Sequence, residues 1–216
     1  MRSKDNPIGQ EATRTFTETA RRAQIAAAAI DTIAELGYGQ ASLARIAETA
    51  GTSKGVILYH FGGKDDLIRE LVSELSARGR AYLGPQLEAE PTGTGMLRTY
   101  IQANLAFIRD NRNHVLATVE IALNGRSADG SPLYDLSIRE AGIAALQELL
   151  AHFQGTGGFR AGFDPLVMAL AIRATLDAVP ARLAREPGLD LDHYGRELAD
   201  LFQIATTAHR KSVEET

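Results

Sequence analysis

The chain has 216 residues, enough for one or two small domains with a buried core, and it contains no cysteine, which excludes a disulfide framework and thiolate chemistry. Its net charge of −4 is uneven, since residues 1–80 hold 11 Lys/Arg against 10 Asp/Glu while residues 81–216 hold 12 against 17, so anion binding is expected in the first third. The longest apolar runs, such as residues 167–172, are far shorter than the roughly 20 residues that cross a bilayer, so we expect a cytoplasmic protein without a membrane partner.

Residues 1–15 are polar and lack helical periodicity, which predicts a flexible N-terminal arm. A first helix is expected from about residue 16 to residue 36, because Ile25, Ala29, Ile33 and Leu36 recur at helical spacing and Gly37 follows. Ser42 is a candidate N-cap for a second helix of only about two turns, which ends at the glycine of position 51.

The stretch after Gly51 combines apolar and polar residues in an unusual way. Thr52 or Ser53 can cap a short helix, Val56, Ile57 and Phe61 can face inward, and glycines 62 and 63 end it before a longer helix from Lys64 to about residue 83. Two short helices around a glycine turn, flanked by longer helices, form the pattern of a helix-turn-helix unit. We therefore place a DNA-binding domain at residues 16–63.

The exposed face of that unit supplies the candidate DNA-binding residues, all of types that suit phosphates or base edges. They are Ser42, Thr52, Ser53, Lys54, Gly55, Tyr59, His60 and Lys64. The lysines offer charge to the DNA backbone, the hydroxyls donate hydrogen bonds, Tyr59 reaches a phosphate or a thymine methyl, and Gly55 allows close approach of the duplex. For His60, a phosphate contact and packing with Phe61 against the first helix are equally open. The competing interpretation of the whole unit is a surface helical hairpin whose polar groups are only solvated.

Residues 64–216 are expected to form a second, helical domain, with further helices near 95–111, 113–124, 132–154, 164–186 and 190–210. No strand alternation stands out, so the prediction is an all-α protein of about nine helices. The last two predicted helices carry many leucines and alanines, which permit close helix approach and predict a homodimer core, and Pro180 is expected to bend the first of them.

Scattered polar residues on apolar helix faces are what a ligand pocket requires. The candidates for such a pocket are Tyr100, Asn104, Phe107, His114, Glu120, Leu123, Tyr134 and Arg173. For each of them the competing interpretation is a satisfied core or edge residue. Asp190, Asp192 and His193 are spaced like metal ligands, but acidic residues at a helix start more simply cap it, so no metal and no cofactor is expected.

Several motifs in order resemble the DNA-binding domain of the TetR family of transcriptional regulators, over roughly residues 20–70. They run from Arg21-Arg22-Ala23-Gln24-Ile25 through Gly37-Tyr38, Ser42-Leu43-Ala44-Arg45-Ile46-Ala47 and Ala50-Gly51-Thr52-Ser53-Lys54-Gly55 to Tyr59-His60-Phe61 and Lys64-Asp65-Asp66-Leu67. The resemblance implies an all-helical homodimer whose second domain binds a small molecule, with repression relieved by that ligand as the commoner mode. Many members read Thr-Leu-Tyr where this chain has Val56-Ile57-Leu58, so the aromatic contact moves to Tyr59 and the base preference does not transfer.

The sequence thus predicts a ligand-responsive, dimeric regulator, most often a repressor, that binds a near-palindromic double-stranded operator. One alternative is a helical small-molecule carrier or enzyme, although no nucleophile–base pair or cofactor loop is legible. Another is a regulator that responds to a partner protein instead of a small molecule.

Overall fold

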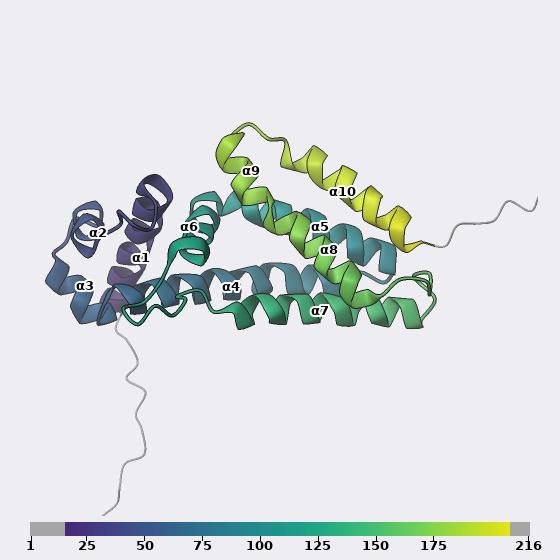
Figure 1. Ribbon diagram of the computed structural model, residues 1–216, viewed down its shortest axis with the longest axis horizontal. Helices are drawn as coiled ribbons and strands as arrows, with labels where there is room; N and C mark the ends of the chain where they lie inside the picture. The colour runs from purple at the N-terminus through teal and green to yellow at the C-terminus, as the bar shows by residue number, and fades with distance from the viewer. Residues whose placement is uncertain (1–15, 208–216) are drawn as a thin grey trace, which may run out of the picture.

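The computed structural model describes residues 16–207, so the predicted N-terminal arm lies outside the described residues. Within that range the chain is helical, and the one pairing of extended residues is an isolated antiparallel bridge between Arg126 and Pro132. Figure 1 shows the ten helices in chain order: α1 (Phe16–Leu36), α2 (Leu43–Thr49), α3 (Lys54–Phe61), α4 (Lys64–Glu88), α5 (Gly93–Asp110), α6 (Arg112–Asn124), α7 (Leu136–Gly155), α8 (Pro165–Asp177), α9 (Val179–Arg185) and α10 (Leu191–Thr206). The predicted all-α class is confirmed.

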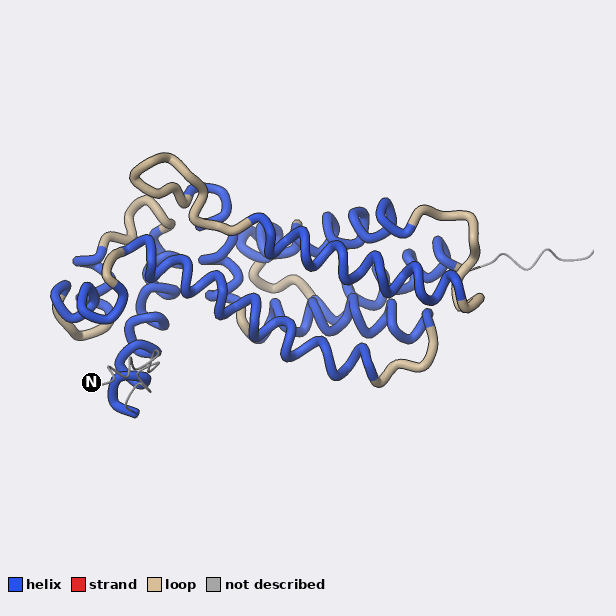
Figure 2. Tube along the Cα trace, turned by 90° about the horizontal axis from the view of Figure 1, so that it is seen from below, coloured by secondary structure: helices blue, strands red, loops and turns tan. Residues whose placement is uncertain are grey.

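The helices form a small head and a longer body. Helices α1 to α3 gather at one end, and α4 begins there and runs along the body, where it packs against α5 and α6 (Figure 1). Seen from below, the head and the body are again distinct, and the loop between α6 and α7 lies close to the head (Figure 2). Because α4 belongs to both parts, it is the rigid connection between them.

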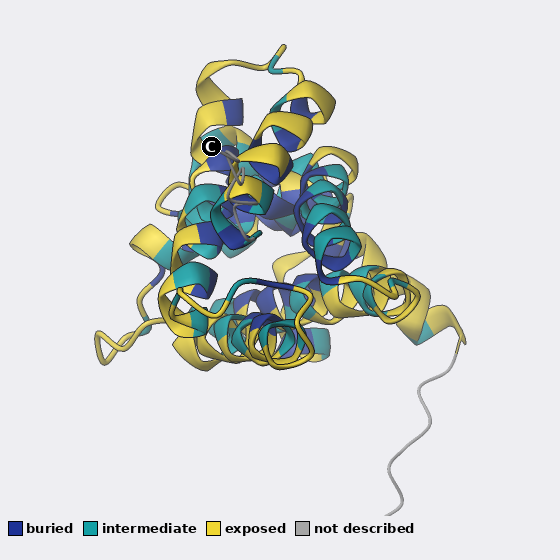
Figure 3. Cartoon of the chain, turned by 90° about the vertical axis from the view of Figure 1, so that its right-hand side faces the viewer, coloured by how far each residue is buried: buried dark blue, intermediate teal, exposed yellow. Residues whose placement is uncertain are grey.

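Two apolar clusters fill the interior, and buried residues line the inward faces of the helices (Figure 3). The body cluster contains residues of α4, α5 and α7 to α10, together with Val115 and Phe159. The head cluster is built on α1 to α3 and the start of α4, but it also takes in Ala117 and Ile121 of α6 and Leu133 of the following loop. A core is therefore shared across residue 63, and the domain division at that residue stays a prediction.

Several helix boundaries differ from the sequence prediction by a few residues, for example α7, which begins at Leu136 and not at 132, and two differences involve prolines. Helix α4 continues through Gly84 and Pro85 to Glu88, because Leu83 and Leu87 pack against the body cluster and this burial outweighs the hydrogen bond that Pro85 cannot donate. The helix expected at 164–186 is interrupted at Ala178, and Pro180 lies in the first turn of α9, where a missing N–H is tolerated. The predicted bend is thus a break into two helices.

Candidate functional site

The two short helices of the head are each fixed by a serine at the N-cap. Ser42 Oγ accepts from the backbone N–H of Arg45 at 3.3 Å, and Ser53 Oγ accepts from that of Val56 at 3.3 Å. Between them Gly51 has φ of +58°, a left-handed conformation that favours glycine. The caps and the turn set the mutual orientation of α2 and α3.

Helix α3 divides cleanly into an inner and an outer face. Ile57 and Phe61 are buried in the head cluster, whereas Lys54 and Gly55 are exposed and Tyr59 is 80% exposed. Thr52, just before the helix, is half-buried. A helix that exposes a lysine and a tyrosine on one face and buries apolar side chains on the other has the form of a recognition helix, which enters a major groove with its exposed face.

His60 lies between the two faces. Its ring is half-buried and meets the Tyr59 ring edge-on, with centroids 5.1 Å apart and an angle of 80°. The Nδ1 atom is buried and has no hydrogen-bond partner among residues 16–207. His60 therefore packs at the edge of the head, which leaves its role toward DNA open.

Lys64 is the one DNA-binding candidate whose charged group lies against the protein. Its ammonium donates to the carbonyl oxygen of Tyr38 at 3.1 Å and lies 4.0 Å from the centroid of the Tyr38 ring. Burial lowers the pKa of Lys64, while the charge of Asp65 raises it. Burial and then Asp65 raise the pKa of Tyr38.

Three of the eight effector-site candidates come together in the body. Arg173 of α8 donates to Tyr100 Oη at 3.3 Å and to Asn104 Oδ1 at 3.2 Å, both on α5. It also pairs with Asp177 at 2.5 Å, and Arg139 of α7 pairs with the same carboxylate at 3.3 Å. We call these five residues the Arg173 cluster. Its two arginines around one acid join α5, α7 and α8.

Tyr134 lies near the Arg173 cluster and also packs against the head cluster. Burial raises the pKa of Tyr134, the charge of Asp177 raises it further, and Arg173 lowers it. This tyrosine therefore lies between the body's polar cluster and the core of the head.

The other four effector-site candidates lie elsewhere. Phe107 packs against Tyr82 with ring centroids 5.7 Å apart, and Leu123 is 67% exposed. His114 is buried between α4 and α6, with Nε2 3.0 Å from the carbonyl oxygen of Leu71. Glu120 accepts from the backbone N–H of Tyr38 at 3.4 Å, so it touches the head and not the Arg173 cluster.

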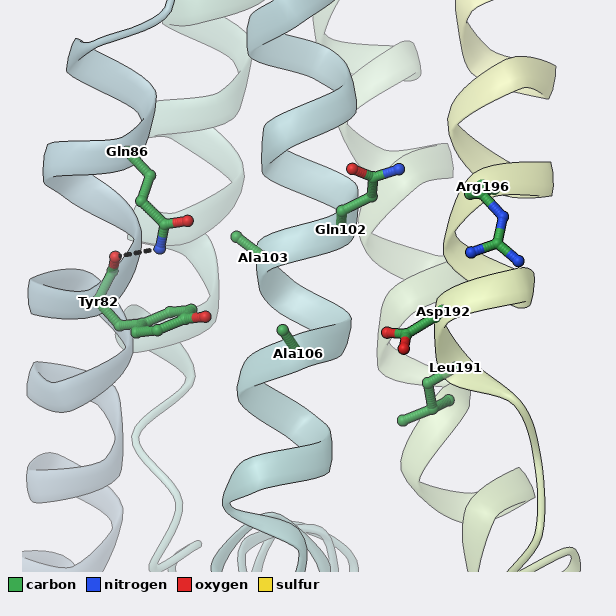
Figure 4. A pocket seen from close by; sticks show the side chains of 8 residues that line it. All are labelled: Tyr82, Gln86, Gln102, Ala103, Ala106, Leu191, Asp192 and Arg196. Atoms are coloured by element: carbon green, nitrogen blue, oxygen red, sulfur yellow. Dashed lines mark hydrogen bonds between the residues drawn. The ribbon is translucent and has the colours of Figure 1, made fainter.

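A groove of about 370 Å³ lies between α4, α5 and α10, and none of the eight candidates lines it. The side chains around it are Tyr82, Gln86, Gln102, Ala103, Ala106, Leu191, Asp192 and Arg196 (Figure 4). Two alanines form part of the α5 wall, and Gln102 and Arg196 bring polar groups to the side next to α10 (Figure 4). These residues come from three separate helices, and no spacing in the sequence links them.

The acidic residues at the start of α10 act as a cap. Asp190 accepts from the backbone N–H groups of Asp192 and His193 at 3.1 and 2.9 Å, which lowers the pKa of its carboxyl group. In residues 16–207 no three His, Asp or Glu side chains are arranged to hold a metal ion. Over the same residues, no helix is both long and apolar enough to cross a membrane.

An exposed recognition helix in a helix-turn-helix head, joined by α4 to a helical body, defines the class of helical DNA-binding regulators. The family model of "Bacterial regulatory proteins, tetR family" matches residues 25–71. The HTH-type transcriptional repressor AcnR of Corynebacterium jeikeium is 30% identical over 171 residues, which are 79% of this chain and 85% of that protein. The chain therefore belongs to the TetR family of transcriptional regulators, whose members are not enzymes.

Other similarities are shorter or concern the fold. The regulator BetI 1 of Chromohalobacter salexigens is 42% identical over 55 residues, which are 26% of this chain and 27% of that protein. The solved structure of the fatty acid degradation regulator FadR from Bacillus halodurans superposes with a TM-score of 0.74 at 21% identity, covering 91% of this chain and 97% of that one. The ketosteroid regulator KstR2 of Mycobacterium tuberculosis gives 0.72 at 18% identity, covering 93% and 100%. At these identities the structures support the fold alone.

Proposed function

We propose that this protein is a cytoplasmic, dimeric repressor that leaves a near-palindromic operator when a small molecule binds its body. The observation that carries the proposal is the outer face of α3, where Lys54, Gly55 and Tyr59 are exposed while Ile57 and Phe61 anchor the helix from within. The relative AcnR is a transcriptional repressor, which supports repression as the mode.

In this proposal two copies of α3 enter successive major grooves, about 34–36 Å apart on B-form DNA. Lys54 and Lys64 neutralise phosphates, Tyr59 contacts a base edge, a thymine methyl or a phosphate, and Gly55 admits the duplex closely. Ser42, Thr52 and Ser53 donate their hydroxyl hydrogens to the DNA backbone, since the two serine oxygens that cap helices keep their O–H groups free to donate. His60 is placed at the edge of this interface.

The surface proposed for dimerisation lies on α8 and α10. Of the eleven large apolar residues that are exposed among residues 16–207, five lie on these two helices. They are Leu166, Val167 and Leu170 on α8, and Leu201 and Ile204 on α10. Other large apolar residues of the same helices, such as Ile172, Leu176 and Phe202, are buried within the protomer. Exposed large apolar side chains on these two helices favour a partner surface over solvent.

The effector site is proposed around the Arg173 cluster, which offers two arginines, a tyrosine hydroxyl and an amide within an otherwise apolar body. Tyr134 is included because it lies between this cluster and the head. Ligand binding there would shift α4, which runs through both parts, with a coupling of about 1–3 kcal/mol between ligand and operator. Phe107, His114 and Glu120 have other contacts and Leu123 is exposed, so these four residues are not assigned to the ligand.

The test begins with selection of bound sequences from a random DNA library by the purified protein. We expect a two-fold symmetric motif whose half-sites are about one helical turn apart. A library that yields no enriched motif contradicts the proposed function. Small molecules are then screened by thermal shift, where a true effector raises the melting temperature with the logarithm of its concentration and weakens operator binding. If only a partner protein weakens that binding, the regulator is partner-controlled.

A further inference from the structure

The side chain of Arg22, on α1, reaches both the end of α3 and the first half of α4. Only 11% of the side chain is exposed; one terminal nitrogen donates to the carbonyl oxygen of His60 and the other pairs with the carboxylate of Glu70. The guanidinium carbon lies 4.1 Å from the centroid of the Phe61 ring. A single charged group therefore contacts the recognition helix and the helix that connects head to body.

Arg22 contacts the carbonyl group of His60 at the C-terminal end of α3, where backbone acceptors lack partners within the helix. The last carbonyl groups of a helix lack partners within it and carry the negative end of the helix dipole. In α3 the N–H of Gly62 donates to the carbonyl oxygen of Leu58 at 2.8 Å, and the guanidinium of Arg22 donates to the carbonyl oxygen of His60. With Ser53 capping the start, this eight-residue helix is held at both ends, and Arg22 supplies the charged contact at its C-terminal end.

We propose that Arg22 is a positioning residue for DNA recognition, which fixes α3 against α4 through Glu70 and does not itself touch DNA. This inference rests on the proposed binding of DNA by α3. Its low exposure and its ion pair with Glu70 set Arg22 apart from the neighbouring Arg21, which is exposed and donates to Gln24 Oε1 on its own helix at 2.8 Å. Because Glu70 belongs to α4, a shift of α4 changes the anchor of α3 directly.

Arg22 could instead contact a DNA phosphate directly. A substitution at Glu70 distinguishes this role from the positioning of α3. Glu70→Gln removes a negative charge, so electrostatics alone would tighten DNA binding. Positioning predicts the opposite sign, because the guanidinium of Arg22 loses its carboxylate partner. Arg22→Lys keeps the charge but loses the planar fork that spans two acceptors. Arg21→Ala is the matched control, since it removes one charge from the same helix without touching α3.

The experiment measures operator binding of these three variants, with the operator taken from the selected DNA. We expect Glu70→Gln and Arg22→Lys each to bind about tenfold more weakly, which is the loss expected from one charge-assisted hydrogen bond, while Arg21→Ala changes mainly the salt dependence. Unchanged or tighter binding by Glu70→Gln overturns the proposal, as does an Arg22→Lys protein that binds like wild type.

Hydrogen exchange without DNA gives the second readout. The amides of Lys54–Phe61 should exchange faster in Arg22→Lys and Glu70→Gln than in wild type or Arg21→Ala, while the amides in the middle of α5 keep their protection. Unchanged exchange rates in α3 would also contradict the proposal that Arg22 and Glu70 hold this helix. If the wild-type protein binds no DNA, the proposed function fails, but the exchange experiment still decides whether Arg22 and Glu70 hold α3.

Discussion

Lys64 and Tyr38 link the start of α4 to the turn that follows α1. The lysine ammonium donates to the tyrosine carbonyl at 3.1 Å and lies 4.0 Å from the ring centroid. The same tyrosine donates its backbone N–H to Glu120 of α6 at 3.4 Å. The turn at Tyr38 is therefore held from two sides, by the connecting helix and by the body.

Replacing Lys64 by Ala should show whether this link is also a DNA contact. The loss of the hydrogen bond and of the ammonium–ring contact should lower the free energy of unfolding by about 1–2 kcal/mol, measured by urea denaturation. If Lys64 also neutralises a phosphate, the slope of log K against log salt should fall by about one. Lost stability with an unchanged slope would assign Lys64 to the fold alone.

The side chains of Tyr59 and Lys54 are exposed on α3, so we expect them to contact the bases or the phosphates of the operator and to contribute little to the stability of the fold. We expect Tyr59→Ala and Lys54→Ala to keep the wild-type melting temperature. If either side chain reads a base edge, operator binding should weaken by about 1–3 kcal/mol and the selected motif should change at one position. Equal losses on operator and random DNA would reassign the residue to phosphate.

A substitution at Gly55 should affect the stability of the fold and the binding of DNA in opposite directions. A Cβ at this position would meet only Ser53 Oγ, at 3.7 Å, which is ordinary contact. Gly55→Ala should therefore stabilise α3 by about 0.5–1 kcal/mol, because alanine is the better helix former. If the duplex approaches this backbone closely, the same variant should bind DNA more weakly despite its higher melting temperature. Undiminished DNA binding would show that the approach is not close.

The local features of the head follow from the sequence, since they depend on neighbours in the chain. The cap contacts of Ser42 and Ser53 reach only three residues along the chain, and the inward residues Ile57 and Phe61 are one helical turn apart. Helical periodicity likewise predicts the remaining helices to within a few residues. The exceptions, at Pro85 and Ala178, are places where tertiary packing or a tolerated proline decides the boundary.

The contacts that join distant segments could not be read from the sequence. Arg22 lies three residues before Ile25, so helical spacing places it on the apolar face of the first helix, and only the fold brings it to residues 38 and 48 positions away. Glu120 was a candidate for a ligand because it interrupts an apolar face, yet it bonds the head instead. Periodicity predicts which face of a helix is apolar, but it does not identify the groups that the polar exceptions on that face will meet.

His114 should make stability depend on pH. Since Arg78 can only donate and a carbonyl can only accept, the ring is neutral, with Nδ1 accepting from Arg78 at 3.4 Å and Nε2–H donating to the carbonyl of Leu71 at 3.0 Å. Burial lowers the pKa of His114, the bond to Leu71 raises it, and the charges of Arg78 and Glu74 lower and raise it respectively. The folded protein therefore binds this proton less readily than the unfolded chain does.

As pH falls through the unfolded value of about 6.5 toward the lower folded pKa, the unfolded state binds more protons and the free energy of unfolding decreases. His114→Gln can keep both hydrogen bonds and does not titrate. We expect the melting temperature of wild type to drop more than that of the glutamine variant between about pH 7.5 and pH 5.5. Parallel curves would mean that the other histidines or the carboxylates account for the whole acid response.

The dimer surface can be tested with charges placed on exposed apolar residues. Leu201→Glu on α10 and Val167→Glu on α8 each put a carboxylate where the side chain is 59% and 61% exposed in the protomer, so folding should be little affected. In a dimer the same carboxylate would be buried without a partner, at a cost of several kcal/mol. We expect both variants to sediment as monomers at concentrations where wild type is a dimer.

Leu123→Glu is the matched control, because Leu123 is 67% exposed and lies on α6, away from the proposed interface. It should leave the sedimentation coefficient unchanged. The monomeric variants should also bind the operator far more weakly. A monomer contacts only one half-site, so the affinity gained from a second, linked recognition helix is lost. Dimers that persist in both variants, or a dimer lost only in Leu123→Glu, would move the interface away from α8 and α10.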